Sequence, residues 1–496
     1  MATTRTQGSG RLARFASIVL AGGGALCILM LFYSIYHYGL MGRRSFTSPT
    51  GMVLYYGVPA LLAGALFASL RLEAFKRTGL ALLLLSIGLS IHAANLFLAL
   101  TDARMTAANR TLWLRPGDAE DIFELAREHG VKFDTRNKLQ VISDLNAKGI
   151  DAVPSLIPLV LLKQQPDGTR RSVITLDGVE TLPHGGISNR VTVYCNEEGK
   201  WVVYESDEHG FHNPKGIWSD SVDIVALGDS FTQGGCVPSD QNFVSVIRER
   251  YPKTLNLGMA GQGPLNTLAT LRDYVKPLKP KIVLWFFYEG NDIGDLLYER
   301  QSPLLMRYLG GNFSQSLAGR QAEIDRALAA YIESEKAART VAERPRKMAE
   351  KVGRARHLLG SLIKLNALRQ RFGLVYGDSS QASQYMGPDA NTMMDLLDRA
   401  LREAKATVDT WGGKLYFVYL PERDSCIDSS RAVGDRGQIM TMVRKVGIPL
   451  LDLHYVFRAQ NDPLALFPFR RLGHYNQKGH RLVGDQVIKS ISLSGN

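Results

Sequence analysis

The sequence has few cysteines for its length, and none of them stands at a metal-binding spacing. Its 496 residues include four cysteines, and no pair forms CxxC or CxxH. A structural zinc site is therefore not indicated. His209 and His212 lie close together, but no third ligand follows at a suitable spacing, so we interpret them as loop residues. We expect no metal and no cofactor.

The four cysteines leave two interpretations open. Cys27 lies in an apolar run, whereas Cys195, Cys236 and Cys426 lie in the later part of the chain. If that part is exported, its cysteines face an oxidising compartment. Either Cys195 pairs with Cys236 and one thiol stays free, or all three are buried reduced thiols.

The sequence also lacks the features of a nucleic-acid-binding protein, although its formal net charge is +12. Such a protein gathers Lys and Arg on one folded face, with aromatic or groove-reading motifs among them. Here the basic residues flank apolar runs near the N-terminus and fill a helical stretch around 320–370. We expect no nucleic-acid partner.

Three long apolar runs are present, at residues 15–37, 52–70 and 78–100. Each is long enough to span a hydrocarbon core, which needs about 20 residues of helix. Residues 1–102 are thus predicted to be a membrane anchor with three transmembrane helices, embedded in a bacterial inner membrane. Basic residues before the first run and between the second and third favour a cytoplasmic N-terminus. Three crossings then place the remaining chain in the periplasm or outside the cell.

Beyond the anchor, the pattern predicts an α/β domain. Short apolar segments alternate with amphipathic helices over 221–298 and again over 391–496. This order predicts parallel strands joined by helical crossovers, with functional loops at the carboxyl ends of the strands. Residues 103–220 form an N-terminal accessory region. The insertion at 299–390 is either a solvated helical excursion or a lid over the site. The predicted strands are DIVAL, TLNLG, KIVLWFFY, KLYFVYL and IPLLDL.

Four loops carry residues suited to ester chemistry. Ser230 follows the strand DIVAL in a Gly-Asp-Ser turn, where a serine hydroxyl is exposed at a helix start. Gly261 lies in a glycine-rich loop after TLNLG, and Asn291 follows KIVLWFFY; both offer N–H donors to a developing oxyanion. His474, far along the chain, offers the imidazole base that a serine nucleophile requires.

Together and in this order, the four loops resemble the blocks of the SGNH (GDSL-like) hydrolase superfamily, over about 222–298 and 412–490. The resemblance implies a flavodoxin-like three-layer α/β fold. It implies that Ser230 is the nucleophile and an oxyanion donor. Gly261, with Gly258 as the alternative, and Asn291 would complete the oxyanion hole, and His474 would be the base. His480 then suits a supporting role.

One position departs from this family's pattern. The family commonly has an Asp three residues before the catalytic His, and Arg471 stands there instead. Either a distant acid, Asp452 or Glu422, orients the ring of His474, or a backbone carbonyl does so and the site is a Ser-His dyad.

The expected function is therefore a membrane-anchored serine esterase or O-acyltransferase. Its location suggests acyl esters, above all acetyl esters, of envelope or surface polysaccharide or lipid. The alternative is a catalytically silent scaffold that binds a polysaccharide-assembly partner, which the missing Asp favours.

Overall fold

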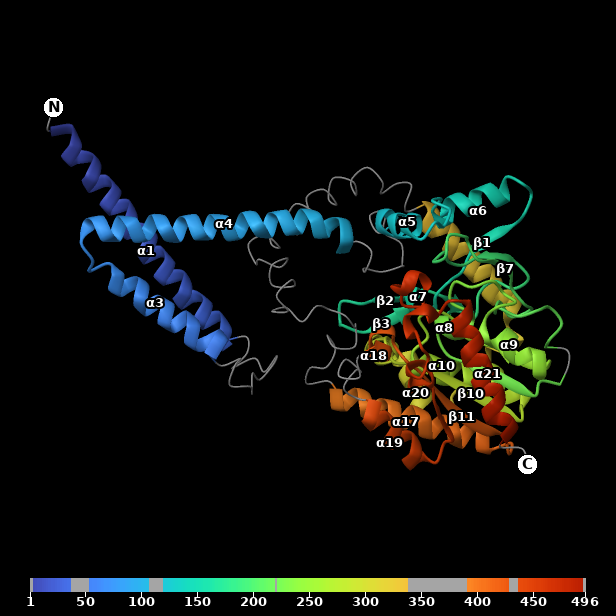
Figure 1. Ribbon diagram of the computed structural model, residues 1–496. Helices are drawn as coiled ribbons and strands as arrows, with labels where there is room; N and C mark the ends of the chain where they lie inside the picture. The colour runs from blue at the N-terminus through green and yellow to red at the C-terminus, as the bar shows by residue number, and fades with distance from the viewer. Residues whose placement is uncertain are drawn as a thin grey trace. The chain divides into compact units, whose positions relative to one another are not determined.

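A computed structural model describes residues 3–36, 53–106, 119–218, 221–337, 390–427 and 436–493 (Figure 1). The chain divides into two compact units, one with the described residues up to Arg104 and the other with the later ones. Each unit is described by itself.

The first unit is helical. Two stretches, Gly10–Ser34 and Ala74–Leu96, are long and apolar enough to cross a membrane. They give weak support to the expected anchor. The predicted middle span is the shorter apolar helix Tyr55–Ser69, so three crossings are not confirmed. The elements are α1 (Thr3–Ser34), the π-helical turn η2 (Val53–Gly57), α3 (Val58–Ser69) and α4 (Ala74–Thr106).

The second unit contains the predicted α/β fold. Its main sheet has five strands in the order β12-β11-β10-β8-β9, and all neighbouring strands are parallel. Each of the five predicted strand segments contributes one strand. They are β8 (Ile224–Leu227), β9 (Thr254–Asn256), β10 (Ile282–Tyr288), β11 (Lys414–Leu420) and β12 (Leu450–Asp452).

Helices cover both faces of this sheet. Successive strand residues point to opposite faces, and the side chains on each face pack against a separate set of helices. Trp285 of β10 packs into one apolar cluster with α10, α17 and α19. Its neighbour Phe286 packs into a second cluster with α9, α20 and α21. The sheet is thus buried on both sides, as parallel sheets generally are. The helices are α9 (Phe243–Arg250), α10 (Pro264–Thr270), η4 (Leu271–Val275), α11 (Lys276–Leu278), α12 (Asp292–Glu299), α17 (Ala390–Asp409), α18 (Arg423–Ile427), α19 (Arg436–Val446), α20 (His454–Arg458), η8 (Pro463–Leu466), η9 (Pro468–Arg470) and α21 (Gln477–Leu493).

The accessory region is built onto this domain. Its buried residues Leu182 and Phe211 belong to the same apolar cluster as Trp285, so the two regions share one core. It contains a three-stranded sheet of order β1-β6-β7 and two hairpins, β2-β3 and β4-β5. The elements are α5 (Ala119–Glu128), α6 (Lys138–Asn146), β1 (Ala152–Pro154), α7 (Pro158–Leu161), β2 (Leu162–Gln164), β3 (Arg170–Ser172), β4 (Thr175–Leu176), β5 (Val179–Glu180), β6 (Val191–Val193) and β7 (Val203–Glu205).

The start of the predicted insertion also packs on the core. Helix 321–337 buries Ile324 and Leu328 in the shared apolar cluster, so this part is not a solvated excursion. Residues 338–389, to which the lid interpretation mainly applies, lie outside the described residues. The preceding short elements are α13 (Pro303–Met306), η5 (Arg307–Leu309) and η6 (Leu317–Gly319).

Candidate active site

Ser230 stands at a sharp turn between β8 and the one-turn helix α8 (Ser230–Gln233). Gly228 makes this turn with a φ of +150°, and a Cβ there would lie 2.8 Å from the Phe286 carbonyl oxygen. Asp229 caps α8 by accepting a hydrogen bond from the Phe231 N–H. Among the described residues no acceptor binds the Ser230 N–H, which therefore remains available to an oxyanion.

The glycine-rich loop after β9 offers a second free donor. The Gly258 N–H donates to the Asn256 side chain at 2.9 Å. In contrast, the Gly261 N–H has no acceptor in the described part of the chain. Gly261 has a φ of +72°, and a Cβ there would lie 2.6 Å from the Cγ2 atom of Ile157. Of the two predicted alternatives, the geometry favours Gly261 as the oxyanion donor.

Asn291 lies beside the nucleophile loop, just before α12. Burial raises the pKa of the Asp229 carboxyl, and a side-chain hydrogen bond from Asn291 partly opposes this rise. An asparagine amide has two N–H donors, so one is left for an oxyanion while the other binds Asp229. Asn291 as an oxyanion donor stays a prediction, and its position beside Ser230 suits that role.

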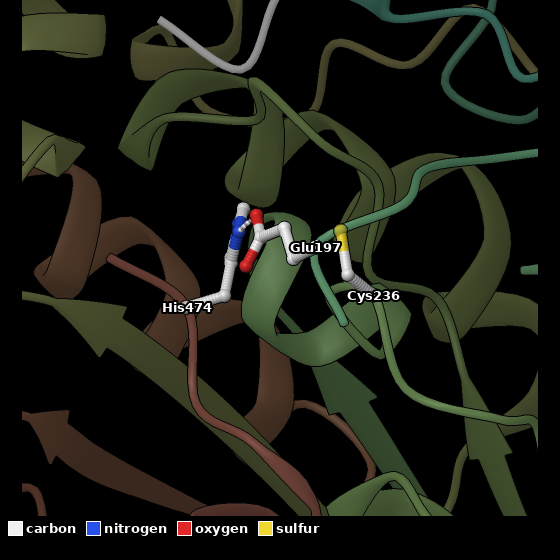
Figure 2. Close-up of side chains that lie close together, drawn as sticks. All are labelled: Glu197, Cys236 and His474. Carbon is white, nitrogen blue, oxygen red and sulfur yellow. Dashed lines mark hydrogen bonds and ion pairs between the residues drawn. The ribbon is translucent and has the colours of Figure 1, made fainter. Parts of the chain in front are cut away.

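His474 reaches the nucleophile directly, since its Nε2 atom lies 2.8 Å from Ser230 Oγ. Its other ring nitrogen, Nδ1, hydrogen-bonds a carboxylate oxygen of Glu197 (Figure 2). With the proton on Nδ1 donated to Glu197, Nε2 accepts the serine hydroxyl proton. Burial lowers the pKa of His474, but the negative charges of Glu197 and Asp229 outweigh this effect and raise it overall. The three side chains form a Glu-His-Ser triad.

Glu197 corrects the sequence-based expectation about the acid, because neither Asp452 nor Glu422 bonds His474. Asp452 ends β12, where its carboxylate pairs with Arg436 of α19. Glu422 is largely buried, which raises its pKa to about 8, and its backbone N–H donates to Glu289. Asp452 thus ends one core strand, and Glu422 lies two residues after another, β11. The orienting acid comes instead from the loop between β6 and β7 of the accessory region.

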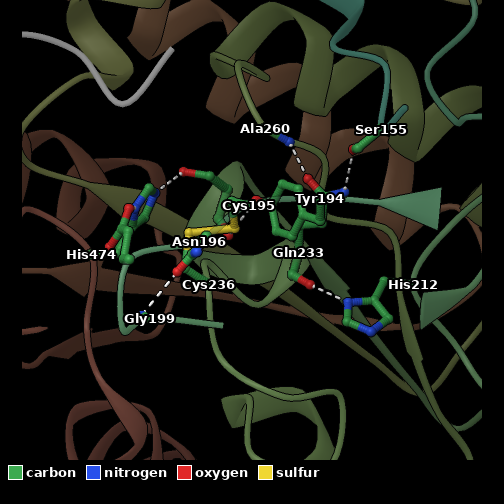
Figure 3. The surroundings of a disulfide bond; sticks show 12 residues. Ser155, Tyr194, Cys195, Asn196, Gly199, His212, Gln233, Cys236, Ala260 and His474 are labelled. Carbon is green, nitrogen blue, oxygen red and sulfur yellow. Dashed lines mark hydrogen bonds and ion pairs between the residues drawn. A yellow bond between two sulfur atoms is a disulfide. The ribbon is translucent and has the colours of Figure 1, made fainter. Parts of the chain in front are cut away.

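A disulfide fixes the loop that carries Glu197. Cys195, two residues before Glu197, is bonded to Cys236, which follows α8 by three residues; their Cα atoms are 5.3 Å apart (Figure 3). Of the two interpretations that the sequence left open, the structure has the disulfide. Cys426 is a buried free cysteine. The bond joins the segment that carries the acid to the segment that carries the nucleophile.

Gln233, the last residue of α8, makes further links to the accessory region. Its side-chain amide donates to the Tyr204 hydroxyl at 3.0 Å and to Ser155 at 3.2 Å. Its side-chain oxygen accepts from the Ala260 N–H at 2.8 Å, next to Gly261 (Figure 3). One buried side chain thereby holds the nucleophile helix, the oxyanion loop and the accessory region in register. Buried polar groups held this way rigidify a site.

Three of these side chains also lie at metal-ligand spacing, since potential ligand atoms of Glu197, Cys236 and His474 lie within 4.8 Å of one another (Figure 2). However, the Cys236 sulfur is already bonded to Cys195, and only a free thiolate is a good ligand. His474 in turn bonds both Glu197 and Ser230. We therefore interpret the group as an acid–base pair beside a disulfide.

The remaining histidines near the site have supporting roles. His480 is fully buried, which lowers its pKa to about 3, and its Nδ1 atom accepts from the Phe243 N–H. His212 bonds Gln233 and Ser239 through its two ring nitrogens, which leaves neither for a metal. Both agree with the sequence-based interpretations.

No protein-family model and no curated protein matches this chain. The chain does match solved structures of lipolytic proteins and esterases, at identities of 13–16% for the three described here. Their TM-scores are near 0.3, so the reaction is inferred from the geometry of the site and not from these matches. One of the three is a lipolytic protein of the G-D-S-L family from Desulfitobacterium hafniense, which is 13% identical, with 54% of this chain and 98% of that chain covered and a TM-score of 0.30. Another is an acetyl xylan esterase, which is 14% identical, with 54% of this chain and 100% of that chain covered and a TM-score of 0.31. The third is a lipase/acylhydrolase from Enterococcus faecalis, which is 16% identical, with 55% of this chain and 96% of that chain covered and a TM-score of 0.28.

Proposed function

We propose that the chain is a serine esterase or O-acyltransferase that acts through an acyl-enzyme on Ser230. The observation that carries this proposal is the unbroken hydrogen-bonded series from Glu197 through His474 to Ser230. A nucleophile, a base and a group that orients the base are the parts that covalent acyl transfer requires. The free N–H groups of Ser230 and Gly261 supply the oxyanion hole.

The reaction follows from these positions. As Ser230 Oγ attacks the acyl carbon, its proton passes to Nε2 of His474, and the carbonyl oxygen becomes an oxyanion. Glu197 stabilises the imidazolium that forms, and the imidazolium then returns the proton to the departing alcohol. Water or a sugar hydroxyl next gives its proton to His474 and attacks the acyl-serine. His474 then returns this proton to Ser230 Oγ as the Oγ–acyl bond breaks, which regenerates free Ser230 and releases an acid or a new ester.

A small acyl group, above all acetyl, suits the site. Ile157 from the accessory region packs against Gly261, at the position where a Cβ would come within 2.6 Å of its Cγ2 atom. An apolar side chain so close to the oxyanion donor limits the room beside the reacting carbonyl. Acetylated envelope polysaccharide or lipid is the proposed substrate class.

The proposed location is the outer side of an inner membrane, with the N-terminus in the cytoplasm. Two apolar helices of spanning length support an anchor. The Cys195–Cys236 disulfide supports an oxidising compartment for the second unit, because such bonds persist in exported proteins. The missing Asp is the sequence feature that favours a catalytically silent scaffold. Because Glu197 bonds His474 in place of that Asp, this feature no longer supports the scaffold.

A fluorophosphonate probe tests the proposal most directly. We expect stoichiometric covalent labelling of the folded wild-type protein, since the activated Ser230 attacks the phosphorus atom and the oxyanion hole holds its oxygen. Ser230→Ala is expected to take no label, as measured by intact-protein mass spectrometry. Wild-type protein that is folded by circular dichroism and yet as unreactive as Ser230→Ala would leave the scaffold function. Acetyl-ester turnover with and without a glycan acceptor then separates esterase from transferase.

Gly235→Ala is expected to lower kcat for a small acetyl ester about 10²-fold, the usual effect of moving a catalytic group by about 1 Å. A Cβ at Gly235 would lie 2.6 Å from Cδ2 of His474, so the imidazole must move away from Ser230. The matched control is Gly473→Ala, where a Cβ meets nothing within 4 Å although the residue adjoins His474. Equal kcat values for the two variants, with equal melting temperatures, would contradict the role of His474.

A further inference from the structure

The accessory region contains a cavity that the catalytic site does not use. It has a volume of about 280 Å³ and is lined by residues from α6, from the segment before α6 and from the segment that leads into β7. Ligand sites start at roughly 300 Å³, so the cavity has room for a small unit of a larger ligand. Six of its lining side chains carry the inference: Asp134, Arg136, Asp144, Lys148, Lys200 and Trp201.

Hydrogen bonds link several of the side chains that line the cavity. The Trp201 indole N–H donates to the backbone oxygen of Arg136 at 3.0 Å. The Arg136 guanidinium in turn donates to Asp134 at 2.6 and 3.0 Å and to Asp144 at 2.7 Å. A half-buried indole beside a hydrogen-bonded set of polar groups suits a sugar ring, whose C–H face packs on an aromatic ring while its hydroxyls bind polar atoms.

The rim of the cavity adds unpaired positive charge. Lys148 and Lys200 are both exposed, and within the described part of the chain neither ammonium group forms an ion pair or hydrogen bond. Arg136 is paired with both aspartates of the cavity. The ammonium groups of the two lysines are therefore the cations that remain for a ligand. Two free ammonium groups beside an indole favour a sugar that carries a carboxylate or a phosphate.

The cavity is also tied to the catalytic loop. Lys200 and Trp201 follow Glu197 by three and four residues. The Asn196 side chain accepts from the Gly199 N–H at 2.9 Å and donates to the Asp134 backbone oxygen at 3.2 Å. The Asp134 N–H closes the link by donating to the Gly199 oxygen at 2.8 Å. The same short loop therefore presents the triad acid on one side and the cavity wall on the other.

We propose that this cavity is a glycan subsite that takes an anionic sugar unit of the polymer whose acyl ester reacts at Ser230. The inference rests on the proposed function for the link to Ser230, whereas binding in the cavity does not depend on it. A subsite remote from the reacting bond provides binding energy that positions a long substrate. A small ester does not reach the subsite and so gains no binding energy from it.

The test measures binding of unacetylated oligosaccharides to the full-length protein in detergent by isothermal titration calorimetry, so that no turnover is involved. We use an oligogalacturonate, a phosphorylated oligomannoside and a neutral xylo-oligosaccharide. At least one anionic ligand is expected to bind, more tightly than the neutral one and less tightly as salt rises. The combined change Lys148→Ala and Lys200→Ala is expected to weaken that binding about 10-fold or more.

Two further variants keep the result interpretable. The control combines Lys445→Ala with Lys489→Ala, two exposed lysines on α19 and α21, and is expected to bind like the wild type. Trp201→Leu keeps an apolar side chain but removes the aromatic face, and should weaken binding while the fold stays intact by circular dichroism. Absence of binding to every oligosaccharide, or unchanged binding by the Lys148 and Lys200 variant, would overturn the subsite. Loss of fluorophosphonate labelling would overturn the esterase function alone.

Discussion

Glu197→Gln is expected to lower kcat for an acetyl ester about 10⁴-fold, the loss seen when the His-orienting acid of a serine triad becomes an amide. The carboxylate of Glu197 accepts the Nδ1 proton of His474 and so leaves Nε2 free to act as the base. An amide in its place can donate to Nδ1, which fixes the wrong tautomer. Steady-state kinetics on a small acetyl ester measure the effect.

The pH dependence of the same variant separates this role from a structural one. His474 must be neutral to accept the serine proton, so activity rises as the pH passes through its pKa. Glu197 raises the pKa of His474, and its loss is therefore expected to move the acidic limb of the pH–rate profile to lower pH. Glu198→Gln, an exposed neighbour on the same loop, is the control and should keep the wild-type profile. An unmoved acidic limb together with kcat near that of the wild type would exclude Glu197 from the triad.

Removing the disulfide by Cys195→Ser with Cys236→Ser is expected to lower kcat about 10²-fold and to destabilise the fold. The bond closes a loop with a sequence separation of 41 residues, which in the chain-entropy view contributes about 3–4 kcal/mol to the free energy of unfolding. Without it the Glu197 loop is free to shift relative to α8, and a shift of about 1 Å explains the loss of rate. The measurements are kcat and the melting temperature.

Reduction of the wild-type protein by dithiothreitol should reproduce the same loss, and the double variant should not respond to the reagent. Cys426→Ala retains the disulfide, so it should respond as the wild type does. Full kcat in a sample whose Cys195 and Cys236 are both alkylated after reduction would show that the bond does not position the acid.

The α/β domain could be predicted because buried parallel strands leave a strong local signal. The run from Ile282 to Tyr288 is continuously apolar, since β10 is covered on both faces. Ser230 and His474 were predictable as well, because each occupies a loop whose composition matches a known chemical role. The structure brings the two within 2.8 Å of each other.

Glu197 could not be predicted in the same way, because the loop that carries it follows a short strand outside the repeating α/β pattern. A carboxylate in a turn is ordinary composition, and nothing local shows that it reaches a histidine 277 residues away. The one available signal was the cysteine pair, since Cys195 lies two residues before Glu197 and Cys236 six residues after Ser230. For the same reason the sequence predicts an accessory region, whereas in the structure this region shares the core of the α/β domain.

The triad joins parts of the chain that are very far apart in sequence, with separations of 277 positions from Glu197 to His474 and 244 from Ser230 to His474. Contacts over such separations form slowly, because the chain loses loop-closure entropy before they stabilise it. Helices such as α9 and α21 depend on local hydrogen bonds and form sooner. Catalytic competence is therefore one of the last properties that the folding chain acquires, and partly folded molecules that already have native helix content are inert toward nearby esters.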